Sequence, residues 1–528
     1  MSNYERKAKS MKEKKLPWPK QPAQSGIAGL LRTTCALRLL LLLLLTLPAG
    51  VQAQFNYATN NGTITIVGYT GPGGVVAIPD TINGLPVTGI GDWAFYLNTN
   101  LTSVTIPGGV TNLGRQAFGA CRSLSSVMMA SGVISIRNEA FHSCRSLANV
   151  VIPNSVTSIG NSAFDDCRSL ASVTIGSGVT SIGNYAFFGC TNLMSFTIPN
   201  NVTNVGDSAF RGCSSLASVT IPSSVTSIGV TVFSYCASLT AITLDVDNST
   251  YGSVDGVLFN KSLTALIQCP GGKTGNYTIP SSVTSIVGLA FTGCTSLTSV
   301  TIPNSVTIIG RGAFIDCSSL ASVIIPNSVT SLGDSAFSGC TSLTSVTIPN
   351  GVTRIEGAAF RDCSSLASVT IPSSVTSIGG QAFLNCTSLA SVTIGSGVTS
   401  IEYEAFSGTS LNSVYFEDNA PSLGQYAFGY PTFYSLPGTT GWETFGKPTV
   451  LWKSQIQAGD ASFGVRTNQF GFNITWASGR VVVVEACTEL AHPIWSPVGT
   501  NTLTDGSSYF SDPQWTNYPG RFYRLRSP

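Results

Sequence analysis

Apolar and polar residues follow a pattern that returns every 23 residues over most of the chain. In one copy, residues 365–387, Leu366, Val369 and Ile371 fit the spacing Leu-x-x-Val-x-Ile. This alternation puts Val and Ile on the same face of a short strand. Pro372 has no backbone donor and is expected to end that strand.

The rest of the copy predicts how the chain returns to the start of the next one. Val375 and Ile378 are spaced to point inward again, ahead of a Gly-Gly turn. Ala382, Phe383 and Cys386 have i, i+1, i+4 spacing, which predicts a short helical turn on the opposite wall. Each copy is therefore expected to form one coil of a β-rich repeat solenoid, with a short strand and a helical turn around a shared core.

The phenylalanine of the Ala-Phe pair sets the register of this array, which we place at residues 91–436. It recurs at 23-residue intervals in two series: Phe95, Phe118, Phe141, Phe164, Phe187, Phe210 and Phe233, then Phe291, Phe314, Phe337, Phe360, Phe383 and Phe406. A fixed period of this size is typical of stacked units that cannot bury their apolar faces alone. The gap between the two series predicts an elongated repeat or insertion at 237–290, projecting as a hairpin or loop.

These motifs resemble a known family. Leu-x-x-Val-x-Ile-Pro, Ser-Val-Thr-x-Ile-Gly and Ala-Phe-x-x-Cys look like the BspA-type leucine-rich repeat of bacterial and protist surface proteins, over roughly residues 80–430. The resemblance implies a leucine-rich-repeat solenoid and adhesion to host or matrix proteins, or to other cells. The usual asparagine of such repeats would fall at Ser374, so the standard asparagine ladder is missing, and the cysteine has moved to the helical side.

The first 53 residues are typical of a secretion signal. Basic residues precede seven consecutive leucines, Leu39–Leu45, and small residues suit cleavage after Ala53. A retained membrane anchor is the alternative, although the apolar run is shorter than the ~20 residues that span a bilayer. Either Met1 or Met11 fits as the start. We expect a secreted or cell-surface protein that touches the membrane only if this segment stays uncleaved.

The remaining segments differ from the repeat. Residues 54–90 alternate β-branched residues with Gly and Pro turns, which predicts a β cap on the first coil. Residues 437–453 are interpreted as a linker, and 454–528 as a small all-β C-terminal module.

The small number of charged residues limits the kinds of ligand that the chain is expected to bind. Only 10% of residues are charged, against roughly 25% in typical soluble domains. Removal of residues 1–53 takes away nine basic and two acidic residues and changes the net charge from +2 to −5. Such a chain does not attract a phosphate backbone, so nucleic acid is not an expected partner.

Eleven cysteines stand three residues after a repeat phenylalanine: Cys121, Cys144, Cys167, Cys190, Cys213, Cys236, Cys294, Cys317, Cys340, Cys363 and Cys386. They could be buried thiols that fill a gap between coils. Disulfides between neighbouring coils are a second interpretation, although equivalent side chains in a stack point in parallel. Metal ligation is a third, without the close Cys pairs and histidine partners of zinc sites. We interpret them as a structural cysteine ladder.

Catalytic constellations are nearly absent from the sequence. The chain has two histidines, His142 and His492, and nothing around either marks a Ser-His-Asp set. Acidic residues before the repeat cysteines alternate with Gly, Ser and Asn in other copies, so we interpret them as variable surface positions: Asp165, Asp166, Asp316 and Asp362.

A calcium site is the strongest metal candidate. Asp245, Asp247, Asn248 and Asp255 carry oxygen ligands, but EF-hand spacing is missing and turn chemistry explains them as well. We therefore predict no catalytic residue, no cofactor and no metal site.

The array presents a regular surface instead. Outward serines and threonines alternate with the inward Val and Ile, which predicts two hydroxyl rows along the strands: Ser172, Thr174, Ser218, Thr220, Ser299, Thr301, Ser345, Thr347, Ser368, Thr370, Ser391 and Thr393. Met128, Phe196 and Tyr415 interrupt the rows as apolar contact candidates, with Phe196 expected inward. The rows could bind a ligand, or they could only keep exposed strands soluble.

We expect an exported, non-enzymatic repeat protein that binds an extracellular protein or polysaccharide in cell-surface adhesion. Two other classes stay open. One is a structural envelope or matrix spacer that displays the C-terminal module, and the other is a glycan-active protein with its site in that module.

Overall fold

The computed structural model describes residues 54–467, 469–477, 479–490 and 493–526. The predicted secretion signal (1–53) and His492 lie outside the described residues. Within those ranges, the helical segments are too short or too polar to cross a bilayer.

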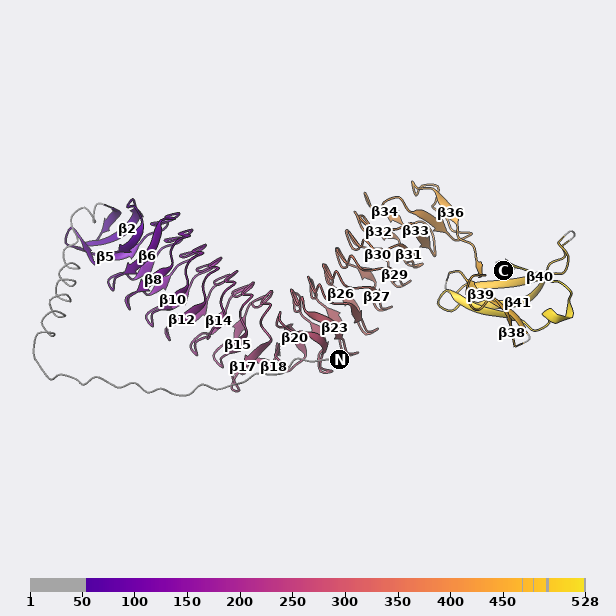
Figure 1. Cartoon of the computed structure of the whole chain (residues 1–528), viewed down its shortest axis with the longest axis horizontal. Helices are drawn as coiled ribbons and strands as arrows, with labels where there is room; N and C mark the ends of the chain where they lie inside the picture. Colours follow the sequence, from indigo (N-terminus) through magenta and orange to yellow (C-terminus); the bar gives the residue numbers. More distant parts are fainter. Residues whose placement is uncertain (1–53, 468, 478, 491–492, 527–528) are drawn as a thin grey trace, which may run out of the picture. The chain divides into compact units, whose positions relative to one another are not determined.

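Two series of parallel strands run along the array, because each coil pairs with the equivalent strands of its neighbours (Figure 1). The longer strands are β6 (Leu101–Ile106), β8 (Ser126–Met129), β10 (Asn149–Ile152), β12 (Ser172–Ile175), β15 (Ser218–Ile221), β17 (Ala241–Leu244), β21 (Gly275–Thr278), β23 (Leu297–Thr301), β25 (Ser322–Ile324), β27 (Ser345–Thr347), β29 (Ser368–Ile371), β31 (Ser391–Ile394), β33 (Ser413–Phe416), β35 (Thr432–Ser435) and β36 (Thr449–Leu451).

The second series consists of two-residue strands on another wall of each coil. They are β7 (Asn112–Leu113), β9 (Ser135–Ile136), β11 (Ser158–Ile159), β13 (Ser181–Ile182), β14 (Asn204–Val205), β16 (Ser227–Ile228), β22 (Ser285–Ile286), β24 (Ile308–Ile309), β26 (Ser331–Leu332), β28 (Arg354–Ile355), β30 (Ser377–Ile378), β32 (Ser400–Ile401) and β34 (Ser422–Leu423). The predicted repeat solenoid is confirmed.

Both sheets continue into the segment before the first coil. The two-residue series extends through β5 (Leu85–Ile90), β2 (Thr63–Tyr69) and β1 (Phe55–Asn60), and the longer series starts at β3 (Gly74–Ala77). A short strand, β4 (Thr81–Ile82), pairs with β5.

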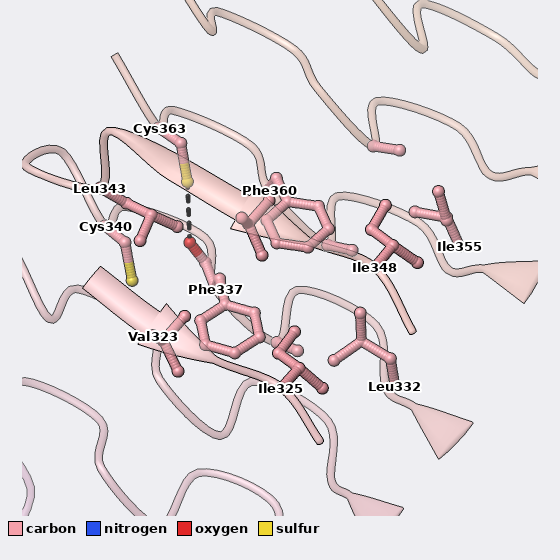
Figure 2. Close-up of a cluster of buried hydrophobic side chains, with 14 of the residues drawn as sticks. Val323, Ile325, Leu332, Phe337, Cys340, Leu343, Ile348, Ile355, Phe360 and Cys363 are labelled. Atoms are coloured by element: carbon pink, nitrogen blue, oxygen red, sulfur yellow. Dashed lines mark hydrogen bonds between the residues drawn. The ribbon is translucent and has the colours of Figure 1, made fainter. Parts of the chain in front are cut away.

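The predicted inward residues form one continuous core. Val369 and Ile371 of β29 are buried while Ser368 and Thr370 are exposed, and the repeat phenylalanines are all buried. In each series these rings stack face to face, with centroids 4.6–5.7 Å apart from Phe95 to Phe233 and from Phe291 to Phe406. Figure 2 shows two of them, Phe337 and Phe360, between the Ile and Leu side chains of adjacent coils.

The wall that carries the phenylalanine differs from expectation. It is a run of turns rather than a helical turn, because alternate N–H groups bond to the next coil. The N–H groups of Gln381 and Phe383 donate to the carbonyls of Tyr403 and Ala405, while that of Ala382 donates three residues back within its own coil. A helix would direct every N–H within the coil and leave nothing to join neighbours.

Two residues of this wall, four positions apart, adopt left-handed backbone conformations in each regular coil. Gln381 has φ 60° and Asn385 has φ 59°, and equivalent residues repeat these values along the array. In several coils the second position is glycine, as at Gly339 (φ 74°), where no Cβ opposes the conformation.

Polar side chains add further hydrogen bonds between coils. Ser374 stands where ordinary leucine-rich repeats carry asparagine, and its hydroxyl donates to the Val352 carbonyl at 2.9 Å. Asn161 accepts from the Asn184 N–H at 2.9 Å, so an asparagine ladder does exist, at a different corner of the coil. Thr180 donates to the Thr157 carbonyl at 3.2 Å, and threonines at the same position do likewise in other coils.

The insertion builds its own strands into the array. β18 (Tyr251–Val254) and β19 (Val257–Asn260) form an antiparallel hairpin, and β20 (Ala265–Gln268) joins β19 to the second run of two-residue strands. The hairpin was expected to project, but Val257, Leu258 and Phe259 of β19 are fully buried. Both sheets of the array are interrupted here.

The C-terminal residues form a separate small core. Two antiparallel sheets contain β37 (Gln455–Gln457), β38 (Gly464–Arg466), β39 (Gln469–Thr475), β40 (Val481–Cys487), β41 (Ser496–Thr502), β42 (Ser507–Asp512) and β43 (Phe522–Arg526), with a 3-10 helix at Trp515–Asn517. Before them, in the segment interpreted as a linker, Phe445 packs edge-on against Phe416 and Phe433 of the last coils.

Replacement of Phe337 by Ala should destabilise the chain by about 3–5 kcal/mol, because a fully buried ring is removed from the stack. Each coil contacts only its neighbours, so the damage should be local. Hydrogen exchange should rise mainly between residues 314 and 383 and stay unchanged in the coils before the insertion. A uniform rise across the whole array would contradict this expectation.

Candidate binding surface on the strand face

The predicted hydroxyl rows lie on the outer face of the longer strands, which we call the strand face. Thr347 pairs with Thr370, and Thr370 pairs with Thr393, so these residues form a straight row in register. The structure divides the twelve predicted residues among three sheets. Eight lie together on β23–β31, two on β15 and two on β12.

Three of the twelve predicted hydroxyls make a side-chain hydrogen bond to a neighbouring strand. The Thr220 hydroxyl lies 2.9 Å from that of Thr243, and Ser172 donates to the Asn149 side-chain carbonyl at 2.6 Å. Ser299 donates to Asn276 in the same way, at 2.7 Å. The other nine make no side-chain hydrogen bond within the described residues, so most of the row hydroxyls remain free for a ligand.

Larger side chains interrupt the threonine row. Met128, Val151 and Ile324 occupy threonine positions and are 64%, 62% and 78% exposed. Tyr415, another predicted interruption, stacks on Tyr434 with centroids 4.7 Å apart and is half-buried.

Phe196 changes the strand face most. Its ring points inward, as expected, and packs edge-on against Phe187 and Phe210 with centroids 5.1 and 4.4 Å away. Residues 195–198 form no strand, whereas the equivalent residues of the coils on either side are β12 and β15. The ring is larger than the Val of other copies, which accounts for the loss of pairing.

A groove of about 530 Å³ opens at this break, and we call it the Phe196 groove. Thr197, Ser218 and Thr220 line one part, and Asp245 and Val246 at the start of the insertion line another. Val246 is 90% exposed. The strand face and the insertion thus meet in one depression.

The eleven repeat cysteines lie buried on the opposite side of the core, and all are free thiols. Ten of them donate to the carbonyl of the repeat phenylalanine in the preceding coil at 3.0–3.2 Å. Figure 2 shows this bond between Cys363 and Phe337. Cysteine is small enough for the gap between coils and still supplies a donor.

Burial also keeps nine of these eleven thiols protonated, because it raises their pKa. It raises the pKa of Cys121, Cys236 and Cys386 to about 12 in each case. A protonated thiol is a poor nucleophile and metal ligand, so this geometry supports the packing interpretation.

The 23-residue register, the inward Val, Ile and Phe, and the buried cysteine coincide with a known repeat profile. The family described as "BspA type Leucine rich repeat region (6 copies)" matches residues 78–193, 134–265, 271–365 and 307–434, well over half of the chain. The chain belongs to the BspA-type leucine-rich repeat family.

Solved structures of similar proteins agree with this assignment. A leucine-rich cell-surface protein of Faecalibacterium prausnitzii is 35% identical, with a TM-score of 0.52 over 64% of this chain and 92% of that protein. A leucine-rich repeat protein of Eubacterium ventriosum is 28% identical, with a TM-score of 0.53 over 70% of this chain and 90% of that one. Among curated proteins, none matches.

The BspA-type array brings a Ser-His-Asp group together that sequence reasoning did not foresee. His142 Nε2 lies 3.2 Å from the Ser143 hydroxyl, and His142 Nδ1 lies 3.2 Å from an Asp165 oxygen. The hydrogen bond with Asp165 raises the pKa of His142, which favours the imidazolium over the base that a hydrolase needs. Ser143 itself donates to Asp166 at 3.2 Å and is only 8% exposed. The arrangement is that of an ionic network.

Arginines complete this network on the surface of the array. Asp166 also contacts Arg145 and Arg168 at 2.7 and 2.5 Å, and its pKa is lowered by these hydrogen bonds against the opposing effect of burial. The signal in the sequence was the 23-residue offset that places Asp166 beside Ser143.

The candidate calcium ligands are used for turns. The Asn248 side chain is buried and bonds to the Pro222 and Val225 carbonyls and to the N–H groups of Thr250 and Tyr251. Asp255 has φ 50° and sits in the tight turn between β18 and β19. The part of the chain that the structure describes holds no cluster of three or more His, Cys, Asp or Glu suited to a metal.

A second depression, of about 680 Å³, lies at the last coil and was also missed. Tyr426 and Tyr430 line it, 63% and fully exposed respectively, together with Glu404 and Lys447. The next strand begins four positions after Phe428, against eight positions after Phe383, so the segment that covers the ring in other coils is shorter here.

The thiol bond makes a prediction for Cys363. Replacement by Ala removes both volume and donor and should destabilise the chain by about 1–2 kcal/mol. Replacement by Ser keeps a donor toward the Phe337 carbonyl and should lose less than half as much. Urea unfolding of both variants provides the comparison. A Ser variant less stable than the Ala variant would show that cysteine acts only as an apolar filler.

The ionic network predicts a pH dependence. The pKa of His142 is higher in the folded than in the unfolded chain, so its stabilisation is complete below about pH 6.5 and is lost as pH rises through the folded value. The His142→Gln variant should therefore lower the melting temperature more at pH 5.5 than at pH 8.5. An equal loss at both pH values would exclude a charged His142.

Proposed function

We propose that this BspA-type protein acts at the cell surface as a non-enzymatic binding protein and holds an extended extracellular polymer, protein or polysaccharide, along its strand face. Membership of the family supports the surface location, as does the cell-surface protein of F. prausnitzii among its structural neighbours. The predicted secretion signal fits the same location. Adhesion is the role that this combination favours.

The Phe196 groove is the observation that carries the proposal. It combines an apolar part, Phe196, Leu244 and Val246, with hydroxyl and carboxylate groups at its border. Its volume of about 530 Å³ lies within the range of ligand sites, and it opens onto the strand face. A polymer that extends along the face would have one anchoring point there.

The exposed apolar residues on the strand face also support a ligand that lies along this face. Met128 and Val151 lie on adjacent strands, two and one coils before β12 respectively, so apolar contacts continue along the face toward the groove. The rest of the face is uncharged hydroxyl surface, which imposes no charge selection on the ligand. Shape and apolar contact would then set specificity more than charge.

The decisive experiment compares two doubly substituted forms of the chain without residues 1–53. Thr197→Asp with Thr220→Asp adds two charges to the groove, and Asn204→Asp with Ser227→Asp adds two charges to exposed positions of the other sheet in the same coils. Each protein is titrated against immobilised matrix proteins and polysaccharides. We expect the groove variant to bind at least 10-fold more weakly and the control variant to bind like the parent.

Other outcomes identify the competing functions. Equal binding by all three proteins would place the contact elsewhere and favour a spacer that displays the C-terminal module. Depolymerisation of a polysaccharide by the parent chain would contradict the non-enzymatic assignment and direct attention to residues 454–528.

A further inference from the structure

Cys269 is a cysteine outside the 23-residue register. It lies in the insertion, directly after β20, and is 1% exposed within the core that begins the second phenylalanine series. Its N–H donates to the Ala290 carbonyl at 2.8 Å, which holds it against the coil that carries Phe291 and Cys294.

Cys294 is the repeat cysteine that lacks the usual acceptor. The other ten repeat thiols lie 3.0–3.2 Å from a phenylalanine carbonyl, but the residue 26 positions before Cys294 is Gln268. The Cys294 sulfur instead lies 3.6 Å from the Pro270 carbonyl oxygen and 3.9 Å from that of Cys269.

The two sulfurs share one neighbour. Cys269 Sγ is 3.8 Å from the same Pro270 oxygen, so both thiols converge on one carbonyl group. Repeat cysteines point in parallel from equivalent positions, which works against pairing. Cys269 comes from a different position in its coil, so that obstacle is absent.

We propose that Cys269 and Cys294 form a disulfide that fastens the insertion to the second half of the array. Each thiol loses a proton and together they give up two electrons, while a thiol–disulfide oxidant is reduced to two thiols. The bond would close a loop of 25 residues. The remaining repeat cysteines keep their hydrogen bonds and stay reduced.

The burial of Cys269 determines when the disulfide can form. Once the coil has closed, desolvation raises the pKa of Cys269 and suppresses the thiolate that exchange needs. Pairing must therefore precede closure of this coil, and the finished bond is shielded from reductants. The oxidising setting rests on the proposed cell-surface location, but the pairing can be tested independently of it.

The test uses the purified chain from residue 54, refolded from the reduced state in a buffer of reduced and oxidised glutathione. Alkylation after denaturation, without reductant, counts the free thiols by mass. Thirteen cysteines are present, and we expect eleven to react and one cross-linked peptide to join Cys269 to Cys294. Thirteen reactive thiols, or pairing between two other cysteines, would overturn the proposal.

Variants supply an independent readout. Reductant should lower the melting temperature of the parent chain and of the Cys340→Ser control, which changes a regular ladder position. It should leave that of Cys269→Ser unchanged. A reductant effect that persists in Cys269→Ser would contradict the assignment. Because refolding needs no export, failure of the disulfide is distinguishable from failure of the proposed function.

Discussion

Hydrogen bonding from coil to coil is the constraint on which the rest of the structure depends. The backbone N–H and carbonyl groups of each coil must meet those of equivalent residues in the coils before and after it. Regular coils must therefore have the same length. On the wall that carries the phenylalanine, this requirement divides the N–H groups equally between the coil and its neighbour. The left-handed residues follow, although each costs about 1–2 kcal/mol outside glycine. The stacked rings and thiols occupy positions that this backbone repeats.

The same constraint shapes the surface. Serine and threonine hydroxyls donate to backbone carbonyls of the preceding coil, and asparagine side chains accept from backbone N–H groups of the following coil. Uncharged side chains therefore satisfy backbone groups that would otherwise bond to water. This accounts for a surface with few charges. These regular positions, which lie outside the strand face, are occupied with the array itself. The proposed ligand contacts lie where the repeat is broken, at Phe196 and at the exposed Met128, Val151 and Ile324.

The solenoid could be predicted because the 23-residue period and the alternation of inward and outward residues are both visible as spacing along the sequence. Val369, Ile371 and Phe383 lie where that spacing puts them. The helical turn was expected because i, i+1, i+4 spacing is the same for a helix and for this run of turns, and only the neighbouring coil decides between them. The new position of the asparagine ladder depends likewise on contacts between coils.

The features of the candidate sites were harder to infer. Phe196 was expected to point inward, but its effect on strand pairing, and hence the groove, arises from crowding between three coils. The ionic network of His142 required two residues 23 positions apart to be seen as neighbours. Tyr430 was hidden because the last copy is too short to align. In each case the decisive contact joins different copies of the repeat, and spacing within one copy does not reveal it.

One structural consequence concerns how such a chain can change in length over generations. Internal coils present equivalent faces above and below, so a gene that gains or loses one 69-base-pair unit brings matching surfaces together again. The Tyr235 hydroxyl, however, bonds to Asp316 at 2.6 Å across the insertion, and Tyr235 also packs beneath Arg211. That coil has no interchangeable neighbour. The array therefore consists of two runs of coils that can gain or lose a copy, separated by an insertion that cannot be exchanged. Natural variation in coil number should leave this insertion unchanged.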